Sequence, residues 1–142
     1  MVNLIRTNDL DLIKSVFHHP DIKPIIMDEE VDLPITDSVY WLAAYQSSIL
    51  CGLIVFFPIY SLAWNPHIAV LPEHRGCGTE IMKAGIRWMF DKTPCNKIIA
   101  FPFQPIMLRV YEKSGFSVDG FSPKLLTKGG RQIDCYFVGL SK

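Results

Sequence analysis

The sequence has no excess of charge, because its 14 lysine and arginine residues balance 14 aspartate and glutamate residues. A protein that holds a nucleic acid along its surface needs a basic field, so we expect no nucleic-acid partner. The chain also lacks a long hydrophobic run. Its most apolar stretch, ILCGLIVFFPI at residues 49–59, is about half the length of a membrane span and contains a proline, so we expect no membrane partner.

The start of the chain, MVNLIRTNDLDLI, lacks the basic flank and apolar core of a secretory signal, which predicts a cytoplasmic protein. Metal-binding patterns are scarce as well. His18 and His19 adjoin each other without ligand partners at helical spacing, and a solvated helix end accounts for them. Four cysteines lie far apart, without the paired short spacings of a zinc site: Cys51, Cys77, Cys95 and Cys135. We therefore predict reduced thiols and no metal site.

The 142 residues are 49% hydrophobic, which is enough to bury one core, so we expect a single domain over residues 1–142. Hydrophobic periodicity, caps and turn residues predict the element order β-α-α-β-β-β-α-β-α-β-β. The predicted strands are 2–6, 38–46, 48–59, 61–71, 96–103, 116–127 and 131–140, and the predicted helices are 7–19, 79–92 and 105–115. Residues 21–34 are predicted to form a short second helix and a loop that ends in acidic residues. The three strands between 38 and 71 follow one another through short polar turns, which suggests an antiparallel meander.

The segment LPEHRGCGTE, residues 71–80, lies between a predicted strand and a predicted helix. A tight turn at Gly76 and Gly78, followed by a helix that begins near Thr79, can present several backbone N–H groups to an anion. Glycine suits this role because no Cβ stands between the donors and a phosphate oxygen. Two glycines alone more often form an ordinary turn, so the surrounding residues must distinguish an anion-binding loop from such a turn.

Two familiar phosphate-binding loops do not fit this spacing. The Walker loop requires a lysine in a G-x-x-x-x-G-K-[ST] pattern, and no lysine follows Gly78 at that place. The dinucleotide fingerprint requires a third glycine, where this chain has Ile81. Both kinds of nucleotide site are therefore excluded.

A third kind of loop matches. IAVLPEHRGCGTEI, residues 68–81, is similar to the V-x-P-x-x-R-G-x-G segment of the GNAT superfamily of acyl-CoA N-acyltransferases, and YEKSGF, residues 111–116, resembles its second common segment, Y-E-K-x-G-F. The element order resembles that fold from end to end. The resemblance implies an α/β (α+β) fold with a mixed, mainly antiparallel central sheet. A weaker resemblance, in an H-x-x-V-L-P-E-x-R-G segment, is to compact GNAT-like proteins of tailed phages, which would place the chain in the host cytoplasm.

The resemblance implies an N-acetyltransferase that moves an acetyl group from acetyl-CoA to a primary amine. It assigns cofactor contacts to the strand before the glycine loop, to the loop, and to one residue further on: Ile68, Ala69, Val70, Arg75, Gly76, Cys77, Gly78, Thr79, Glu80 and Gln104. One of these positions departs from the family pattern, which has a small residue where this chain has Glu80. A carboxylate near a pyrophosphate repels it, although the backbone N–H of this residue can still serve.

The resemblance places Tyr111 at the position of the general acid. A phenol with an ordinary pKa of about 10 can protonate a thiolate of similar basicity, and the alternative is a core tyrosine with its hydroxyl satisfied. His67 is the titratable side chain of WNPH and is the candidate general base. Strand alternation puts His67 on the face opposite Ile68 and Val70 unless Pro66 forms a bulge, so a structural histidine is an equal alternative. Because Cys77 sits on the loop, we expect direct attack rather than a covalent enzyme intermediate.

The acceptor is expected to be a small-molecule or protein amine. The segment between the first two helices carries four acidic residues that could attract a cationic amine, although a solvated acidic loop is the alternative: Asp28, Glu29, Glu30 and Asp32. A second functional hypothesis is a non-catalytic CoA-binding or protein-interaction module of the same fold. A third possibility is assembly through exposed strand edges, in which pairing through the last strands would make the protein a homodimer.

Overall fold

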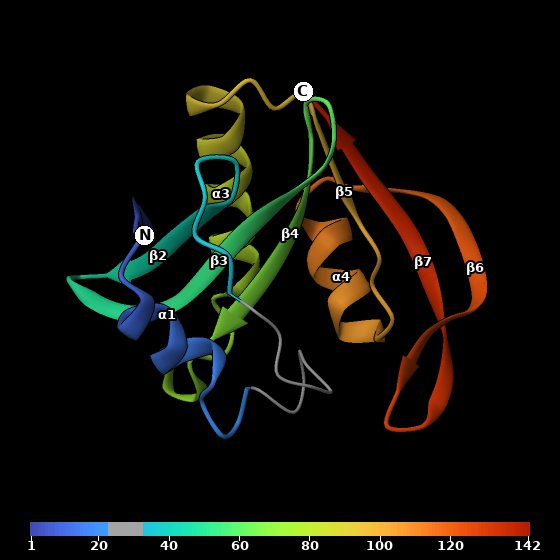
Figure 1. Ribbon diagram of the computed structural model, residues 1–142, viewed down its shortest axis with the longest axis horizontal. Coiled ribbons are helices and arrows are strands. Elements are labelled where there is room, and N and C mark those ends of the chain that lie inside the picture. Colours follow the sequence, from blue (N-terminus) through green and yellow to red (C-terminus); the bar gives the residue numbers. More distant parts are fainter. Residues whose placement is uncertain (23–32) are drawn as a thin grey trace.

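A computed structural model of the chain describes residues 1–22 and 33–142 (Figure 1). The second predicted helix, with the acidic residues Asp28, Glu29, Glu30 and Asp32, lies almost entirely outside the described residues. Elsewhere the observed elements follow the predicted order. The prediction of strands and helices from periodicity is therefore confirmed for the part of the chain that is described.

The described residues form one seven-stranded sheet with the order β1-β2-β3-β4-β5-β7-β6. Its strands are β1 (Asn3–Arg6), β2 (Tyr40–Gln46), β3 (Ile49–Tyr60), β4 (Ala63–Val70), β5 (Lys97–Ala100), β6 (Ser117–Lys128) and β7 (Arg131–Ser141). All neighbours pair antiparallel except β4 and β5, which are parallel. The sheet is thus mixed and mainly antiparallel, as expected, and the strands from β2 to β4 form the predicted meander.

The helices begin and end where the sequence signals stand. Helix α1 (Leu10–Phe17) is capped by Asp9, whose carboxylate accepts hydrogen bonds from two backbone N–H groups of the first turn. Helix α3 (Gly78–Lys92) follows a short 3-10 turn, η1 (Pro72–His74). Helix α4 (Pro105–Lys113) starts with a proline at its first position. None of the described helices is long and apolar enough to cross a bilayer.

Two hydrophobic clusters cover the two faces of the sheet. On one face α1 packs on β2 and β3, and on the other α3 and α4 pack over the middle strands (Figure 1). The middle strand of the meander is buried on both faces, because six consecutive residues of β3, from Cys51 to Phe56, are buried. Gly85 lets α3 approach this strand closely, since a Cβ there would lie 2.9 Å from Ile54 Cδ1 and 3.2 Å from the Phe56 ring.

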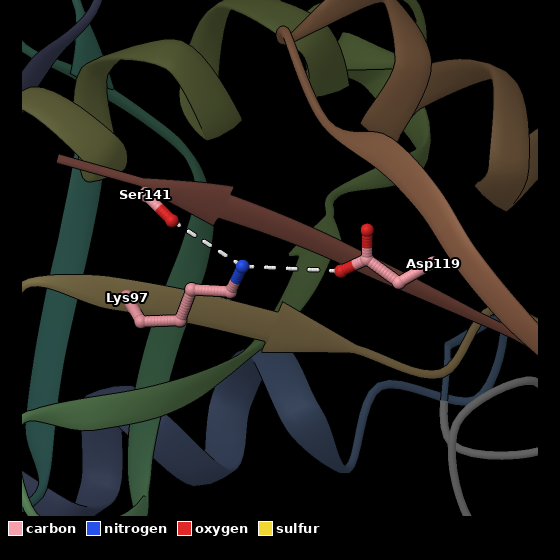
Figure 2. Close-up of polar contacts among 3 residues, drawn as sticks. All are labelled: Lys97, Asp119 and Ser141. Carbon is pink, nitrogen blue, oxygen red and sulfur yellow. Dashed lines mark hydrogen bonds and ion pairs between the residues drawn. The ribbon is translucent and has the colours of Figure 1, made fainter.

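The second half of the sheet is held together by its last strands. A tight turn at Gly129 and Gly130, both with positive φ, joins β6 to β7 between the strands predicted at 116–127 and 131–140. Figure 2 shows a polar contact across β5, β7 and β6, in which Lys97 Nζ lies 3.3 Å from Ser141 Oγ and 3.8 Å from Asp119 Oδ2. The Lys97 side chain can cross β7 because Gly139 lies beneath it and has no side chain.

All four cysteines are buried and none is joined to another. The described residues contain no group of three or more His, Cys, Asp or Glu side chains placed to hold a metal ion. Neither a disulfide nor a metal therefore contributes to the described core, which rests on the two hydrophobic clusters.

Candidate functional site

Strands β4 and β5 separate after a short contact, and this separation creates the candidate site. They pair only at Ala63 with Lys97 and at Trp64 with Ile98. Beyond Trp64 the strands diverge, and Figure 1 shows α4 in the gap between them. The side chain of Asn65 reaches across the opening, where its Nδ2 donates to the carbonyl oxygen of Ile99 at 2.8 Å. From Pro66 to Val70 no described strand pairs with the outer edge of β4.

The direction of the backbone groups along this edge follows from the pairing of β4 with β3. Leu71 N donates to Cys51 O at 2.9 Å, so Leu71 and Cys51 form a hydrogen-bonded pair of the β3–β4 ladder. In an antiparallel ladder, hydrogen-bonded pairs alternate with pairs whose N–H and C=O groups point away from the partner strand. The backbone groups of Ile68 and Val70 therefore point out from the free edge, while those of Ala69 are turned toward Leu53 of β3.

The glycine loop at the end of β4 presents a set of unused donors. The backbone N–H groups of Gly76, Gly78, Thr79 and Glu80 have no acceptor among the described residues, and no side chain caps the start of α3. Gly76 has a φ of +106°, a conformation that few other residues adopt, and the space around its missing Cβ is open. Together with the positive end of the α3 dipole, these donors suit an anion such as a diphosphate.

A cavity of about 740 Å³ joins the free edge of β4 to the glycine loop. Its lining is contributed by Ile22 in the turn that follows α1, by β4, by the loop and first residues of α3, by the β5–α4 connection, by α4, and by β6 and β7. Of the residues assigned by resemblance, nine line it: Ile68, Ala69, Val70, Arg75, Gly76, Gly78, Thr79, Gln104 and Tyr111; the candidate base His67 lines it as well. The tertiary structure thus brings ten of the twelve sequence-predicted site residues to one cavity.

Tyr111 lies beneath the free edge of β4. Its side chain is buried, packs edge-on against Phe116 with ring centroids 5.0 Å apart, and reaches Pro66 O with its hydroxyl at 3.3 Å. Burial raises the pKa of the Tyr111 phenol above its ordinary value of 10, because the ionised form is poorly solvated there. The phenol therefore keeps its proton at neutral pH. Its long hydrogen bond is a weak one and can be exchanged for another acceptor.

His67 lies on the opposite face of β4 from Ile68 and Val70. The register between β3 and β4 runs without interruption from Val70 to Trp64, so Pro66 introduces no bulge. The His67 imidazole keeps an exposed edge at the cavity, while Phe57 packs against the ring at 5.5 Å between centroids. The surrounding apolar groups lower the pKa of His67 below 6.5, so the ring is neutral near pH 7.

The two remaining predicted residues face away from the cavity. Cys77 is buried and its Sγ donates to His74 O at 3.0 Å, so its thiol is turned into the protein. Glu80 is exposed and its side chain does not line the cavity. The arrangement thus leaves the Glu80 backbone N–H at the loop and directs its carboxylate to solvent, where water screens it. Gln104, at the N-cap of α4, makes no capping hydrogen bond and its amide is available to the cavity.

Several lining residues were not singled out by the sequence. Asn65 holds β5 at the opening, and Phe101 and Leu125 form part of an apolar wall. Asn65 belongs to the WNPH segment but carries no motif of its own. Three other aromatic residues differ in their surroundings: Phe103 lines the cavity, Trp64 is buried in the core, and Tyr60 is 75% exposed.

This geometry fits a long, flexible molecule that carries a diphosphate at one end and a carbonyl at the other. The unused amides at the loop suit the diphosphate, and the outward backbone groups of Ile68 and Val70 suit an extended chain with amide and carbonyl groups, which pairs with them as a strand would. Acetyl-CoA has this construction. The residues present therefore fit the cofactor that the resemblance implies.

Comparison with known proteins agrees with this geometry. The model of the Acetyltransferase (GNAT) family matches residues 10–116, which include β4, the glycine loop and Tyr111. The chain belongs to the GNAT family. It is accordingly an acetyl-CoA-dependent N-acyltransferase whose acceptor is an amine. A search of curated protein sequences finds no match.

Solved structures show the same fold. A variant of the spermidine N-acetyltransferase of Vibrio cholerae superposes with a TM-score of 0.81 at 17% identity, over 99% of this chain and 93% of that one. The spermidine N-acetyltransferase of Vibrio cholerae in complex with CoA and spermine gives a TM-score of 0.80 at 17% identity, over 99% and 95% of the two chains. The GNAT fold therefore extends over essentially the whole of this chain.

Proposed function

We propose that this GNAT protein binds acetyl-CoA along the free edge of β4 and acetylates a small-molecule primary amine by direct attack. The observation that carries the proposal is the meeting, in one cavity, of the free edge from Pro66 to Val70 and the unused backbone donors of the glycine loop. Arg75 lines the same cavity and adds a positive charge beside these donors.

Each part of the site has a role in this proposal. The backbone N–H groups of Gly76, Gly78, Thr79 and Glu80 hold the diphosphate, and the backbone of Ile68 and Val70 holds the pantetheine arm. When bound, acetyl-CoA supplies an acetyl group activated as a thioester. The protein orients that group at the point where β4 leaves β5, between Tyr111 on one side of the strand and His67 on the other.

Proton movements follow from the two titratable side chains. Neutral His67 accepts, directly or through water, the proton that the amine gives up as its nitrogen bonds to the acyl carbon. As the C–S bond breaks, Tyr111 donates its proton to the departing sulfur. After product release Tyr111 regains a proton from solvent and protonated His67 gives its proton up to solvent. The buried site disfavours the thiolate as much as the phenolate, so the transfer remains feasible despite the raised pKa of Tyr111.

The placement of Cys77 supports direct transfer over a covalent enzyme intermediate. Its thiol donates to the backbone of His74 and does not line the cavity, so it is not directed at an acyl group held along β4. No aspartate or glutamate is found among the described lining residues, which leaves His67 as the candidate base.

Calorimetric titration with acetyl-CoA and with acetyl-pantetheine tests the binding mode. We expect acetyl-CoA to bind at least about 100-fold more tightly, because acetyl-pantetheine lacks the diphosphate that several charge-assisted hydrogen bonds would hold. Equal affinities would contradict the role of the glycine loop. Thiol release with a panel of amines then tests turnover. Tight binding of acetyl-CoA without thiol release would favour the alternative, a non-catalytic CoA-binding module. The lack of a carboxylate base among the described lining residues also favours that alternative.

A further inference from the structure

Beyond the edge of β4, the cavity has an apolar wall that the binding of acetyl-CoA does not explain. Three of its hydrophobic side chains are unusually open to solvent: Ile106 is 66% exposed, Leu125 52% and Phe101 40%. Phe103, Leu126 and Ile22 continue the same lining. Hydrophobic side chains gathered at a cavity while still exposed mark a surface that gains free energy when a ligand covers it.

In this wall, Phe101 lies on the side of the sheet from which the amine is expected to approach. Phe101 follows Ala100, which points into the core under α3 and α4, so strand alternation directs Phe101 to the opposite face. That face is also the one of His67, because Ala69, two residues along β4, packs in the cluster beneath α1. Phe137 packs edge-on against Phe101 at 5.4 Å between centroids and holds its ring in place.

The charges around the cavity do not favour a polycation. No described lining residue carries a carboxylate. Arg75 and Lys128 line the cavity as cations, and His67 contributes an imidazole to the lining. A polyamine carries several positive charges, and each charge that enters an apolar cavity without a partner costs free energy. An amine with one nitrogen and an apolar body meets no such penalty once its nitrogen is neutral.

We infer that the acceptor is a primary amine with an apolar body of about the size of an aromatic ring, which packs against Phe101, Leu125 and Ile106 while its nitrogen lies near His67. This inference rests on the proposed function and names the class of its acceptor. The ring is held by contact and by exclusion of water, and aromatic side chains such as Phe101 and Phe103 offer the edges and faces that pack well against another ring.

The test compares three amines with saturating acetyl-CoA: 2-phenylethylamine, ethanolamine and spermidine. We expect kcat/KM for 2-phenylethylamine to exceed that for ethanolamine by roughly 100-fold, since burying a hydrophobic group of this size favours the transition state by a few powers of ten at most. Spermidine is expected to be the poorer substrate as well. Acetylation of spermidine or ethanolamine ahead of 2-phenylethylamine, or of none of the three, would overturn the inference.

A pair of variants tests the wall itself. Leu125→Glu places a charge at an exposed position of the wall, so we expect the protein to fold and the preference for 2-phenylethylamine over ethanolamine to fall at least 10-fold. Leu62→Glu is the matched control, because Leu62 is 41% exposed in the turn before β4 and does not line the cavity. An unchanged preference in Leu125→Glu, or an equal loss in both variants, would overturn the inference.

Binding of acetyl-CoA distinguishes a failure of the proposed function from a failure of the inferred acceptor class alone. If the wild-type protein fails to bind acetyl-CoA by calorimetry, the proposed function and the acceptor class both fall. If it binds acetyl-CoA and acetylates spermidine best, the proposed function stands and the inference alone is overturned. We expect Leu125→Glu to keep the wild-type affinity for acetyl-CoA, because the free edge of β4 and the glycine loop are untouched.

Discussion

The hydroxyl of Tyr111 donates a hydrogen bond to the carbonyl oxygen of Pro66 at 3.3 Å, across 45 positions of the sequence. This contact ties α4 to the free edge of β4 at the point where the strand has just left β5. It places a buried phenol beside a backbone that no strand of the described residues covers. A group bound along that edge would therefore meet the phenol directly, which makes Tyr111 the side chain whose removal tests the mechanism most sharply.

We expect Tyr111→Phe to lower kcat by 10²- to 10⁴-fold, the usual contribution of a general acid, while the Kd for acetyl-CoA changes little. The variant loses one long hydrogen bond, so the free energy of unfolding falls by about 1 kcal/mol or less. Thiol release and calorimetry measure the two quantities. Tyr60→Phe is the control, because Tyr60 is 75% exposed and lies outside the cavity, and a similar kcat for Tyr111→Phe and wild type would rule out the acid.

Gly76→Ala tests the glycine loop. Gly76 has a φ of +106°, which strains any other residue by about 1–3 kcal/mol, and relief of that strain would move the donors of the loop. We expect the Kd for acetyl-CoA to rise at least about 10-fold. Gly115→Ala is a matched control, since Gly115 has a φ of +98° at the end of α4 and lies outside the cavity lining. Equal losses of affinity in both variants would mean that strain, rather than the loop, is responsible.

The lowered pKa of His67 predicts a dependence of stability on pH. In the unfolded chain His67 takes up a proton near its ordinary pKa of 6.5, whereas in the folded protein it does so only at lower pH. Between these values the unfolded state binds more protons, so the free energy of unfolding falls as pH drops below 6.5 and is fully retained above it. Urea unfolding at pH 5 and pH 7.5 measures this difference. We expect it to shrink in His67→Gln, and an unchanged difference would show that other groups cause it.

Gly85→Val tests the close packing of α3 on β3. The new side chain would overlap Ile54 and Phe56 in a buried layer, so we expect the free energy of unfolding to fall by about 2 kcal/mol. Gly139→Ala is the contrasting variant. The atoms nearest to its Cβ would be the side-chain ends of Lys97 and Asp119, which are free to move aside, so its stability should lie within about 0.5 kcal/mol of wild type. Comparable losses on urea unfolding would contradict this account of the two glycines.

The elements could be predicted from the sequence because their signals are local. Asp9 caps α1, the paired glycines at 129 and 130 turn the last hairpin, and Gly115 follows α4 as its C-terminal stop. Strand ends were less exact. The predicted strand at 96–103 is observed only at 97–100. Pro102 has no N–H to donate to a ladder, although its carbonyl oxygen still accepts a hydrogen bond from Tyr136 N of β7 at 3.0 Å.

The candidate site was predictable in part for the same reason. The spacing of Arg75, Gly76 and Gly78 is a local pattern, and so is the segment that begins with Tyr111, so both could be recognised in the sequence. The acidic side chain of Glu80 suggested a conflict with a bound diphosphate. The structure removes this conflict, because the first turn of α3 points the Glu80 side chain to solvent while its backbone N–H stays at the loop.

By itself, then, the sequence determined the order of the elements, the loop and its unused donors, since caps, turns and periodicity act over a few residues. Only the tertiary structure decided that β4 leaves β5 after Trp64, that Pro66 makes no bulge and keeps His67 on the far face, and that Phe101 and Leu125 share one wall. These features depend on how distant segments pack, and a pattern along the chain carries no record of which edge of a strand remains unpaired.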